Sequence, residues 1–146
     1  MSEPLKSKLE DDLNRARKAR DRLRTTVLSS TLAELKNKEI ETRRPADDEM
    51  VREVLARAVK QRHEAASQMR DAGREELASR EEEEAAMLGE FLPPPLTEAQ
   101  VREMVRELAA AGPSQMGAIM GALVPRIRGR FDGKEASRIV REELES

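Results

Sequence analysis

The sequence predicts an all-α protein in which an N-terminal domain of long helices precedes a small C-terminal three-helix bundle. Apolar residues recur every three or four positions along most of the 146 residues, which is the spacing of one face of a helix. No segment alternates apolar and polar residues as a half-buried strand does. Three consecutive prolines, Pro93 to Pro95, interrupt the helical pattern and divide the chain into two parts.

The first helix is expected to run from Leu5 to about Ile40, because this segment contains neither glycine nor proline. Its main apolar residues fall within about 80° of one another on a helical wheel, and they are Leu9, Leu13, Ala16, Leu23 and Val27. Leu28, Leu32 and Leu35 rotate to a neighbouring face. We therefore expect this long helix to bend or to contact two partners.

Two further helices are expected before the prolines. Asp47 places negative charge at the start of a helix that continues to Asp71, where the helix dipole favours it. Gly73 is well placed to cap the C-terminus of that helix. A third helix is expected from about Arg74 to Phe91, where the prolines stop it.

The domain boundaries follow from the prolines. Residues 1–92 are expected to form the N-terminal helical domain, residues 93–96 a proline-rich linker, and residues 97–146 the C-terminal three-helix bundle. Prolines cannot donate backbone hydrogen bonds and favour an extended, semi-rigid connection. A unit of about 50 residues buries little surface, so the bundle is expected to be marginally stable alone.

Each helix of the bundle has its own start and stop residues. Polar side chains can cap exposed N–H groups, whereas glycine and proline end helices. The residues expected to delimit the three helices are the capping pair Thr97 and Gln100, the stop Gly112 with Pro113, the cap Ser114, the stop Pro125, and the cap formed by Asp132 with Glu135.

The composition leaves little room for catalytic or metal chemistry. The chain has no cysteine, which excludes a thiolate nucleophile and a cysteine zinc site. His63 is the only histidine, so no two-histidine metal site or histidine relay can form. No phosphate-binding glycine loop or nucleophile elbow is present. We therefore expect no catalytic residue, no metal and no cofactor.

The same composition bears on partners and location. Phe91 and Phe131 are the only aromatic residues, which leaves no platform for stacking nucleic-acid bases. The N-terminal segment lacks the apolar core of a secretion signal, and no run approaches the roughly 20 apolar residues of a membrane span. We expect a cytoplasmic protein that does not insert into membranes.

A local excess of positive charge marks the last part of a chain whose net charge is -2. Residues 123–141 hold six basic side chains against two acidic ones, a local charge of +4. Guanidinium groups bind phosphates bidentately, and a short glycine loop can present backbone donors. Two interpretations of these basic residues remain open, contact with phosphates and an ordinary solvated surface. The candidate residues are Arg126, Arg128, Gly129 and Arg130 in a loop, followed by Lys134, Arg138 and Arg141 on the last helix.

Gly117 and Gly121 are the second candidate feature. They are about one helical turn apart and bare a strip of backbone beside the apolar face. Glycine costs a helix interior roughly 1 kcal/mol relative to alanine, so some contact should compensate. Close packing of helices within the bundle and close approach by a nucleic-acid backbone are both compatible with the spacing.

Several basic residues near residue 20 are expected to have a structural role. Arg20 and Arg24 lie toward the apolar side of the predicted first helix. Their stems can be buried while their charged heads meet carboxylates of the second or third helix. Arg15, Lys18 and Arg22 share the exposed side of the same helix.

Three stretches of this chain resemble the GatB/YqeY family: residues 18–41 (KARDRLRTTVLSSTLAELKNKEIE), residues 61–93 (ending in GEFLP) and residues 116–144 (MGAIMGALVPRIRGRFDGKEASRIVREEL). The resemblance covers nearly the whole chain. It implies an N-terminal helical domain followed by a small bundle similar to the tail of GatB, the B subunit of the glutamine-dependent aspartyl/glutamyl-tRNA amidotransferase.

The resemblance further implies that the bundle touches tRNA. The matching positions are Met116, Gly117, Met120, Gly121, Gly129, Asp132, Gly133 and Lys134. Between the two glycines the family often has a basic residue, whereas this chain has Ala118. Phosphate contact is therefore expected from the arginine loop more than from this helix.

We accordingly expect a non-catalytic tRNA-binding accessory protein, with an aminoacyl-tRNA synthetase or an amidotransferase as a possible protein partner. The amidation chemistry of the amidotransferase belongs to a separate catalytic domain, and this chain has no counterpart of it. A label of carbon-nitrogen ligase with glutamine as amido-N-donor would thus be inherited by homology. The alternative is a helical adaptor that binds a protein partner without RNA.

Overall fold

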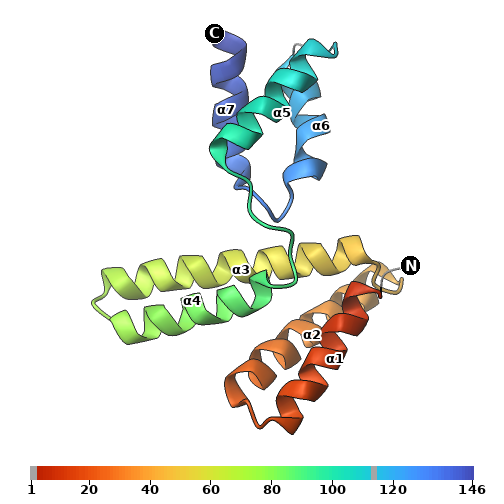
Figure 1. The fold of residues 1–146 in the computed structure, drawn as a ribbon, viewed down its shortest axis with the longest axis vertical. Helices are drawn as coiled ribbons and strands as arrows, with labels where there is room; N and C mark the ends of the chain where they lie inside the picture. The colour runs from red at the N-terminus through yellow and green to blue at the C-terminus, as the bar shows by residue number, and fades with distance from the viewer. Residues whose placement is uncertain (1–2, 113–114) are drawn as a thin grey trace. The chain divides into compact units, whose positions relative to one another are not determined.

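The computed structural model describes residues 3–112 and 115–146, and within them it contains seven α-helices and no strand (Figure 1). The all-α prediction is confirmed. The chain divides into two compact units, residues 1–92 and residues 93–146. The helices are α1 (Leu5–Lys18), α2 (Arg22–Thr42), α3 (Asp48–Asp71) and α4 (Glu75–Gly89) in the first unit, and α5 (Glu98–Ala110), α6 (Met116–Ile127) and α7 (Gly133–Glu145) in the second.

The prediction of one helix from Leu5 to Ile40 is wrong, because the chain turns back between α1 and α2. Arg20 adopts a left-handed conformation with φ 58°, and its N–H donates to the Arg17 carbonyl oxygen at 3.1 Å. Asp21 then caps α2 by accepting from the Arg24 N–H at 3.1 Å. The left-handed region is unfavourable for arginine, so residue 20 itself did not indicate the break, and the local signal was Asp21, a residue type favoured at the start of a helix.

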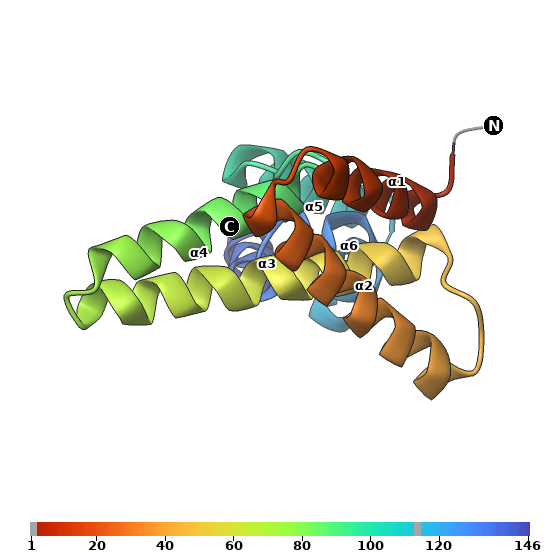
Figure 2. The same cartoon turned by 90° about the horizontal axis from the view of Figure 1, so that it is seen from below.

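The helices α3 and α4 of the first unit pack against each other and run antiparallel (Figure 2). Asp47 caps α3 by accepting from the Met50 N–H at 2.8 Å. Gly73, with φ 75°, closes the C-terminus of α3 through an N–H bond to the Arg70 carbonyl oxygen at 3.0 Å. The predicted second and third helices and the glycine cap are therefore confirmed, although α4 ends at Gly89 rather than at Phe91.

The first unit has one apolar core to which all four of its helices contribute. The buried members are Leu9, Leu13, Val27, Leu28, Leu35, Met50, Val51, Leu55, Ala58 and Leu88. Arg24 spans the edge of this core and contacts carboxylates of two other segments, Asp12 and Glu90. The expected pairing of Arg24 with a carboxylate of the predicted third helix is confirmed for Glu90, whereas Asp12 belongs to α1. The parallel expectation for Arg20 is wrong, since its exposed side chain pairs with no described carboxylate.

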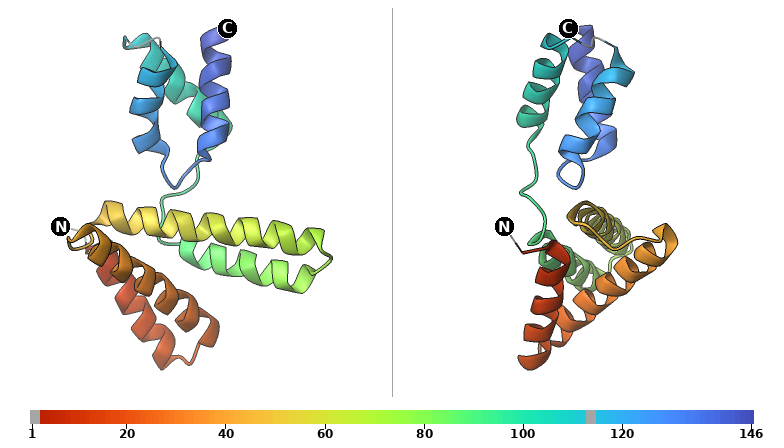
Figure 3. Two further views of the ribbon diagram at one scale, coloured as in Figure 1. Left: turned by 180° about the vertical axis from the view of Figure 1, so that it is seen from behind. Right: turned by 90° about the vertical axis from the view of Figure 1, so that its right-hand side faces the viewer.

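In the second unit α5, α6 and α7 pack against one another (Figure 3). The predicted capping box is present: the Gln100 N–H donates to Thr97 Oγ1 at 3.1 Å, and the Thr97 N–H donates to Gln100 Oε1 at 2.9 Å. Asp132 caps α7 by accepting from the Glu135 N–H at 3.3 Å. The stop after α5 includes Gly112 with φ 147°.

The expected roles of Pro113 and Ser114 fall outside the described residues, and the residue that precedes α6 is Gln115, which makes no side-chain cap. The prediction that Pro125 ends this helix is wrong, because α6 continues through it to Ile127. The proline ring fixes φ near the helical value, so its missing N–H removes one hydrogen bond but does not force the chain out of the helix within the last turn.

The proline-rich segment belongs to the second unit rather than standing between the two. Leu96 is 9% exposed and joins the second apolar core, and its N–H donates to the Arg130 carbonyl oxygen at 2.8 Å. The other buried members of that core are Val101, Val105, Ile119, Leu123, Ile127, Ala136, Ile139 and Val140. This core fixes which sides of α6 and α7 face outward.

None of the described helices combines the length and the apolar character that crossing a membrane requires.

Candidate nucleic-acid interface

The helix α6 turns one half of its surface into the core and leaves the other half open. Ile119, Leu123 and Ile127 are at most 2% exposed. On the opposite side lie small residues that are all exposed, namely Gly117, Ala118, Gly121 and Ala122. The backbone of α6 is therefore accessible along about two turns.

Packing inside the described chain does not explain the two glycines. A Cβ atom added to Gly117 or to Gly121 would meet no heavy atom within 4 Å. The interpretation as close helix packing within the bundle is therefore wrong for the described residues. Each glycine costs α6 roughly 1 kcal/mol relative to alanine, and no described contact offsets this cost.

The basic residues after the glycines do not form the loop that the sequence suggested. Arg126 lies in the last turn of α6, because the helix passes through Pro125. Arg128 is the exposed C-cap residue of α6, and it takes part in an interaction. Gly129, with φ 75°, makes the reversal toward α7. The turn proper thus holds two of the three expected arginines.

Arg130 holds the proline-rich segment. Its Nε donates to the Pro94 carbonyl oxygen at 3.1 Å, and its own carbonyl oxygen accepts from the Leu96 N–H. Proline has no N–H, so a carbonyl of this segment can be satisfied only by a donor from elsewhere. Arg130 is therefore a structural contact of the second unit.

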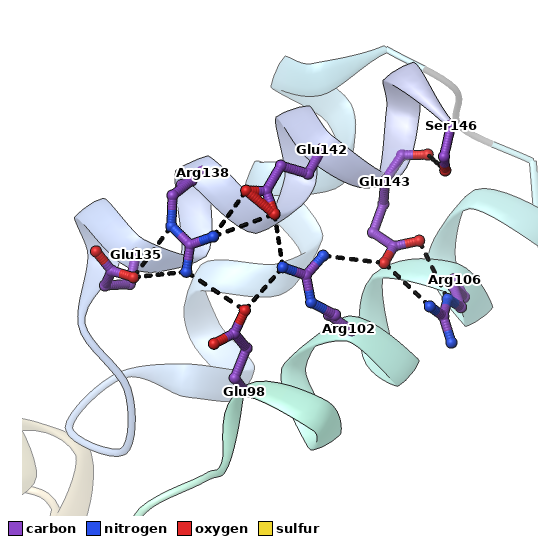
Figure 4. A network of polar contacts seen from close by, with 8 residues as sticks. All are labelled: Glu98, Arg102, Arg106, Glu135, Arg138, Glu142, Glu143 and Ser146. Carbon is purple, nitrogen blue, oxygen red and sulfur yellow. Dashed lines mark hydrogen bonds and ion pairs between the residues drawn. The ribbon is translucent and has the colours of Figure 1, made fainter.

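Arg138 is surrounded by carboxylates (Figure 4). Its guanidinium contacts Glu135 at 2.7 Å, Glu142 at 2.7 Å and Glu98 at 3.4 Å. The pairs with Glu135 and Glu142 lie within α7, whereas Glu98 belongs to α5. The positive charge of Arg138 is thereby compensated inside the unit.

Two arginines of α5 extend the same network toward the end of α7 (Figure 4). Arg102 contacts Glu98, Glu142 and Glu143, and Arg106 contacts Glu143 at 3.1 Å. The guanidinium of Arg102 holds the pKa of Glu98 and of Glu142 below the ordinary value, with a further contribution from Arg138. Arg106 is the main cause of the lowered pKa of Glu143. The carboxylates consequently stay ionised to a lower pH than a free glutamate does.

Three of the candidate cations keep no such partner. Arg126, Lys134 and Arg141 are exposed, and within the described residues their side chains make no hydrogen bond or ion pair. Lys134 and Arg141 are seven residues apart on one face of α7, a rise of about 10 Å. We call these three residues the C-terminal cations.

The structure therefore sorts the candidates into groups rather than one cluster. Gly117 and Gly121 lie on the open half of α6, and Lys134 and Arg141 lie on a face of α7. Of the further positions implied by the family, Asp132 caps α7 and Gly133 begins it. Met116 and Met120 are partly buried against the second core.

The role of Arg102 and Arg106 was missed at the level of sequence. The spacing of Glu98 and Arg102, and that of Arg138 and Glu142, is that of i,i+4 neighbours on a helix. This signal was available and predicts that Arg138 is paired. The contact of Arg102 with Glu142 crosses from α5 to α7, and no local pattern encodes it.

No group of three His, Cys, Asp or Glu side chains in the described part of the chain gathers closely enough to hold a metal ion.

Comparisons with known proteins show a family and a relative to which this chain is similar. A curated relative is the Altered inheritance of mitochondria protein 41, mitochondrial, of Eremothecium gossypii, which is 32% identical over 85 residues. That match covers 58% of this chain and 46% of the relative, so the chain corresponds to about half the length of that protein. The model of the family described as Yqey-like protein matches residues 6–144. With nearly its whole length matched, the chain belongs to the Yqey-like protein family.

Proposed function

We propose that this protein is a non-catalytic tRNA-binding accessory protein whose C-terminal unit contacts the sugar-phosphate backbone. The observation that carries the proposal is the open half of α6, where Gly117 and Gly121 meet no described neighbour. A bare helix backbone lets a partner approach closely, and unpaired cations of the same unit attract phosphates. The lack of an aromatic platform favours contact with the backbone over base stacking.

In this proposal only some of the basic residues contact phosphate. The C-terminal cations, Arg126, Lys134 and Arg141, bind phosphates, because no described carboxylate competes for them. Arg130 and Arg138 support the fold through Pro94 and the glutamates instead.

Titration with total tRNA at several salt concentrations tests the proposal. The variant Arg126→Ala/Lys134→Ala/Arg141→Ala should bind more weakly, and the slope of log affinity against log salt should become shallower by about 0.9 for each lost phosphate contact. The matched control is Arg57→Ala/Lys60→Ala/Arg80→Ala, which removes three exposed cations of the first unit that have no described partner. Equal affinity and slope in the two triple variants would contradict the assignment.

An adaptor that binds protein without RNA is the second candidate, and one observation favours it. Ile40 is 64% exposed and Leu77 is 43% exposed, so both large apolar side chains are accessible to a partner. A synthetase or amidotransferase subunit is the partner that suits the family. Retention of a partner from lysate after ribonuclease treatment, and its loss in Ile40→Ser/Leu77→Ser, would favour the adaptor.

Catalysis by this chain alone is not part of the proposal, since no nucleophile and base pair is evident in the sequence. Glutamine-dependent amidation by the purified chain would overturn this view. The name of the fungal relative places that protein in mitochondria. For this chain a cytoplasmic location stays a prediction, which imaging of the tagged protein would check.

A further inference from the structure

The turn between α1 and α2 carries a hollow that the proposed function does not use. Its volume is about 590 Å³, and it is open to solvent. The lining residues are Arg17, Arg20, Arg22, Thr25 and Thr26. Three arginines and two threonines thus border one open depression, and no acidic residue lines it.

The three arginines of this hollow lack the partners that arginines elsewhere in the first unit have. Their side chains make no hydrogen bond or ion pair with any described residue. Arg24, only two positions after Arg22, contacts both Asp12 and Glu90. Asp21 is the nearest carboxylate in the sequence, but its side chain accepts from the Arg24 N–H as the cap of α2. The positive charge of the hollow is therefore not compensated locally.

Arg20 occupies a position at which glycine would fit better. Its φ is 58°, a conformation that costs a residue with a Cβ roughly 1 kcal/mol or more. The turn bonds in which Arg20 and Asp21 donate to Arg17 and Ala16 need only the backbone. An arginine here adds a third guanidinium to the hollow at the expense of local stability, as residues at functional sites do.

The shape and chemistry of the hollow select among anionic partners. A single free phosphate would need donors around it, whereas this depression is wide and open. A membrane surface would call for exposed large apolar side chains, and Ile40 and Leu77 do not line it. Successive phosphates of a polynucleotide suit several exposed guanidiniums, with threonine hydroxyls as additional donors.

We propose that the α1–α2 turn is a binding site for the phosphodiester backbone of RNA, formed by Arg17, Arg20 and Arg22 with Thr25 and Thr26. It would give the first unit an RNA contact of its own. The site does not depend on the C-terminal cations, and either contact can exist without the other.

The sharpest test replaces Arg20 by glycine in the full chain. Arg20→Gly relieves the left-handed strain, so the variant should melt at a higher temperature and yet bind total tRNA about three- to tenfold more weakly. The matched control is Arg43→Gly: Arg43 has φ 57° and ends α2 with the same turn bonds, but it does not line the hollow. Arg43→Gly should gain stability in the same way and keep wild-type affinity.

A second variant, Arg17→Ala/Arg20→Ala/Arg22→Ala, should weaken binding further and flatten the salt dependence, whereas Arg57→Ala/Lys60→Ala/Arg80→Ala should not. Wild-type affinity in Arg20→Gly and in the hollow triple variant would overturn the site. So would arginine-dependent binding of polyglutamate or of phosphatidylserine vesicles in the absence of RNA binding. If the hollow triple variant binds normally while the variant of the C-terminal cations does not, this inference fails and the proposed function stands. If the hollow triple variant binds weakly while the variant of the C-terminal cations binds normally, this inference stands and the proposed contact of the C-terminal unit fails.

Discussion

Arginines are used in opposite ways in two regions of this molecule. On the α5–α7 face, Arg102, Arg106 and Arg138 are covered by four glutamates. At the turn between α1 and α2, Arg17, Arg20 and Arg22 meet no described carboxylate. The number of arginines in a segment therefore says little about its affinity for phosphate. A carboxylate one helical turn away or on the facing helix competes with phosphate for a guanidinium, so pairing is one condition on that affinity.

The break at residue 20 is the reason for the difference at the turn. In a continuous helix Arg17 and Asp21 would be i,i+4 neighbours and could pair. Because Arg20 turns the chain, Asp21 instead begins α2 and caps it. On α7 the helix is unbroken, so Arg138 keeps both Glu135 and Glu142.

The largest effect is expected from the apolar core beneath the α5–α7 network. Ile139→Ala, at a fully buried position, should cost the second unit about 2 to 5 kcal/mol. Arg102→Leu, which removes the centre of the network, should also destabilise the unit but by less, since ion pairs that keep access to water contribute less than a buried apolar side chain. Because the chain lacks tryptophan and tyrosine, urea denaturation should be followed by circular dichroism, with hydrogen exchange in α7 as the local probe. A larger loss from Arg102→Leu would mean that ion pairs, not the core, hold α7.

Next in size are the two arginines with positive φ. Arg43→Gly and Arg20→Gly should each raise the free energy of unfolding by about 1 kcal/mol, because glycine adopts the left-handed conformation without a Cβ penalty. Thermal denaturation of the full chain measures both. A stability gain at Arg43 but not at Arg20 would show that the Arg20 side chain makes a stabilising contact, which the account of the α1–α2 turn denies.

Replacing either glycine of α6 by alanine should raise stability by a similar amount and weaken tRNA binding. Gly117→Ala and Gly121→Ala should each stabilise α6 by up to about 1 kcal/mol, because the new methyl group meets no neighbour. Both should weaken tRNA binding, since the methyl group covers bare backbone. Gly89→Ala, whose Cβ position on α4 is equally open, serves as the control for binding. Undiminished affinity in the Gly117 and Gly121 variants would refute close approach at α6.

The smallest effect is expected from acid. The pKa values of Glu98, Glu142 and Glu143 are lowered by the facing arginines. Their contribution to stability is therefore complete above their ordinary pKa of about 4.5 and is lost as the pH falls through the lowered folded values. The protection of the α7 amides, relative to the intrinsic exchange rate at each pH, should fall over that window. Protection at the α1–α2 turn, which has no arginine-carboxylate pair at Arg17, Arg20 or Arg22, should change less.

Much of the fold could be predicted from local patterns, and the errors have physical causes. The cap Asp47 and the glycine at position 73 indicate helix ends, because each satisfies a conformational or hydrogen-bonding requirement of the backbone at the end of its own helix. The break at Arg20 could not be predicted, since packing of α1 against α2 overrides an unfavourable backbone conformation there. Pro125 was misjudged because a proline near the end of a helix removes one bond without stopping it.

The candidate site was predictable in part. The positions of Ile119, Leu123 and Ile127 on a helical wheel place Gly117 and Gly121 on the opposite side, so the exposure of the glycines was readable from the sequence. The pairing of Arg138 within α7 was also readable. The hydrogen bond from Arg130 to Pro94 and the contact of Arg102 with Glu142 join distant segments, and only the folded chain reveals them.

The central claim, that on α7 the unpaired and not the paired cations bind RNA, is tested most directly by two neighbours on that helix. Arg141 has no described partner, whereas Arg138 is surrounded by glutamates on the same face. Titration of total tRNA against Arg141→Ala and Arg138→Ala over a range of salt concentrations compares them at equal net charge. The account predicts that Arg141→Ala weakens binding and lowers the salt slope by about 0.9, while Arg138→Ala leaves the slope near that of the wild type. An equal or larger change in Arg138→Ala would contradict it.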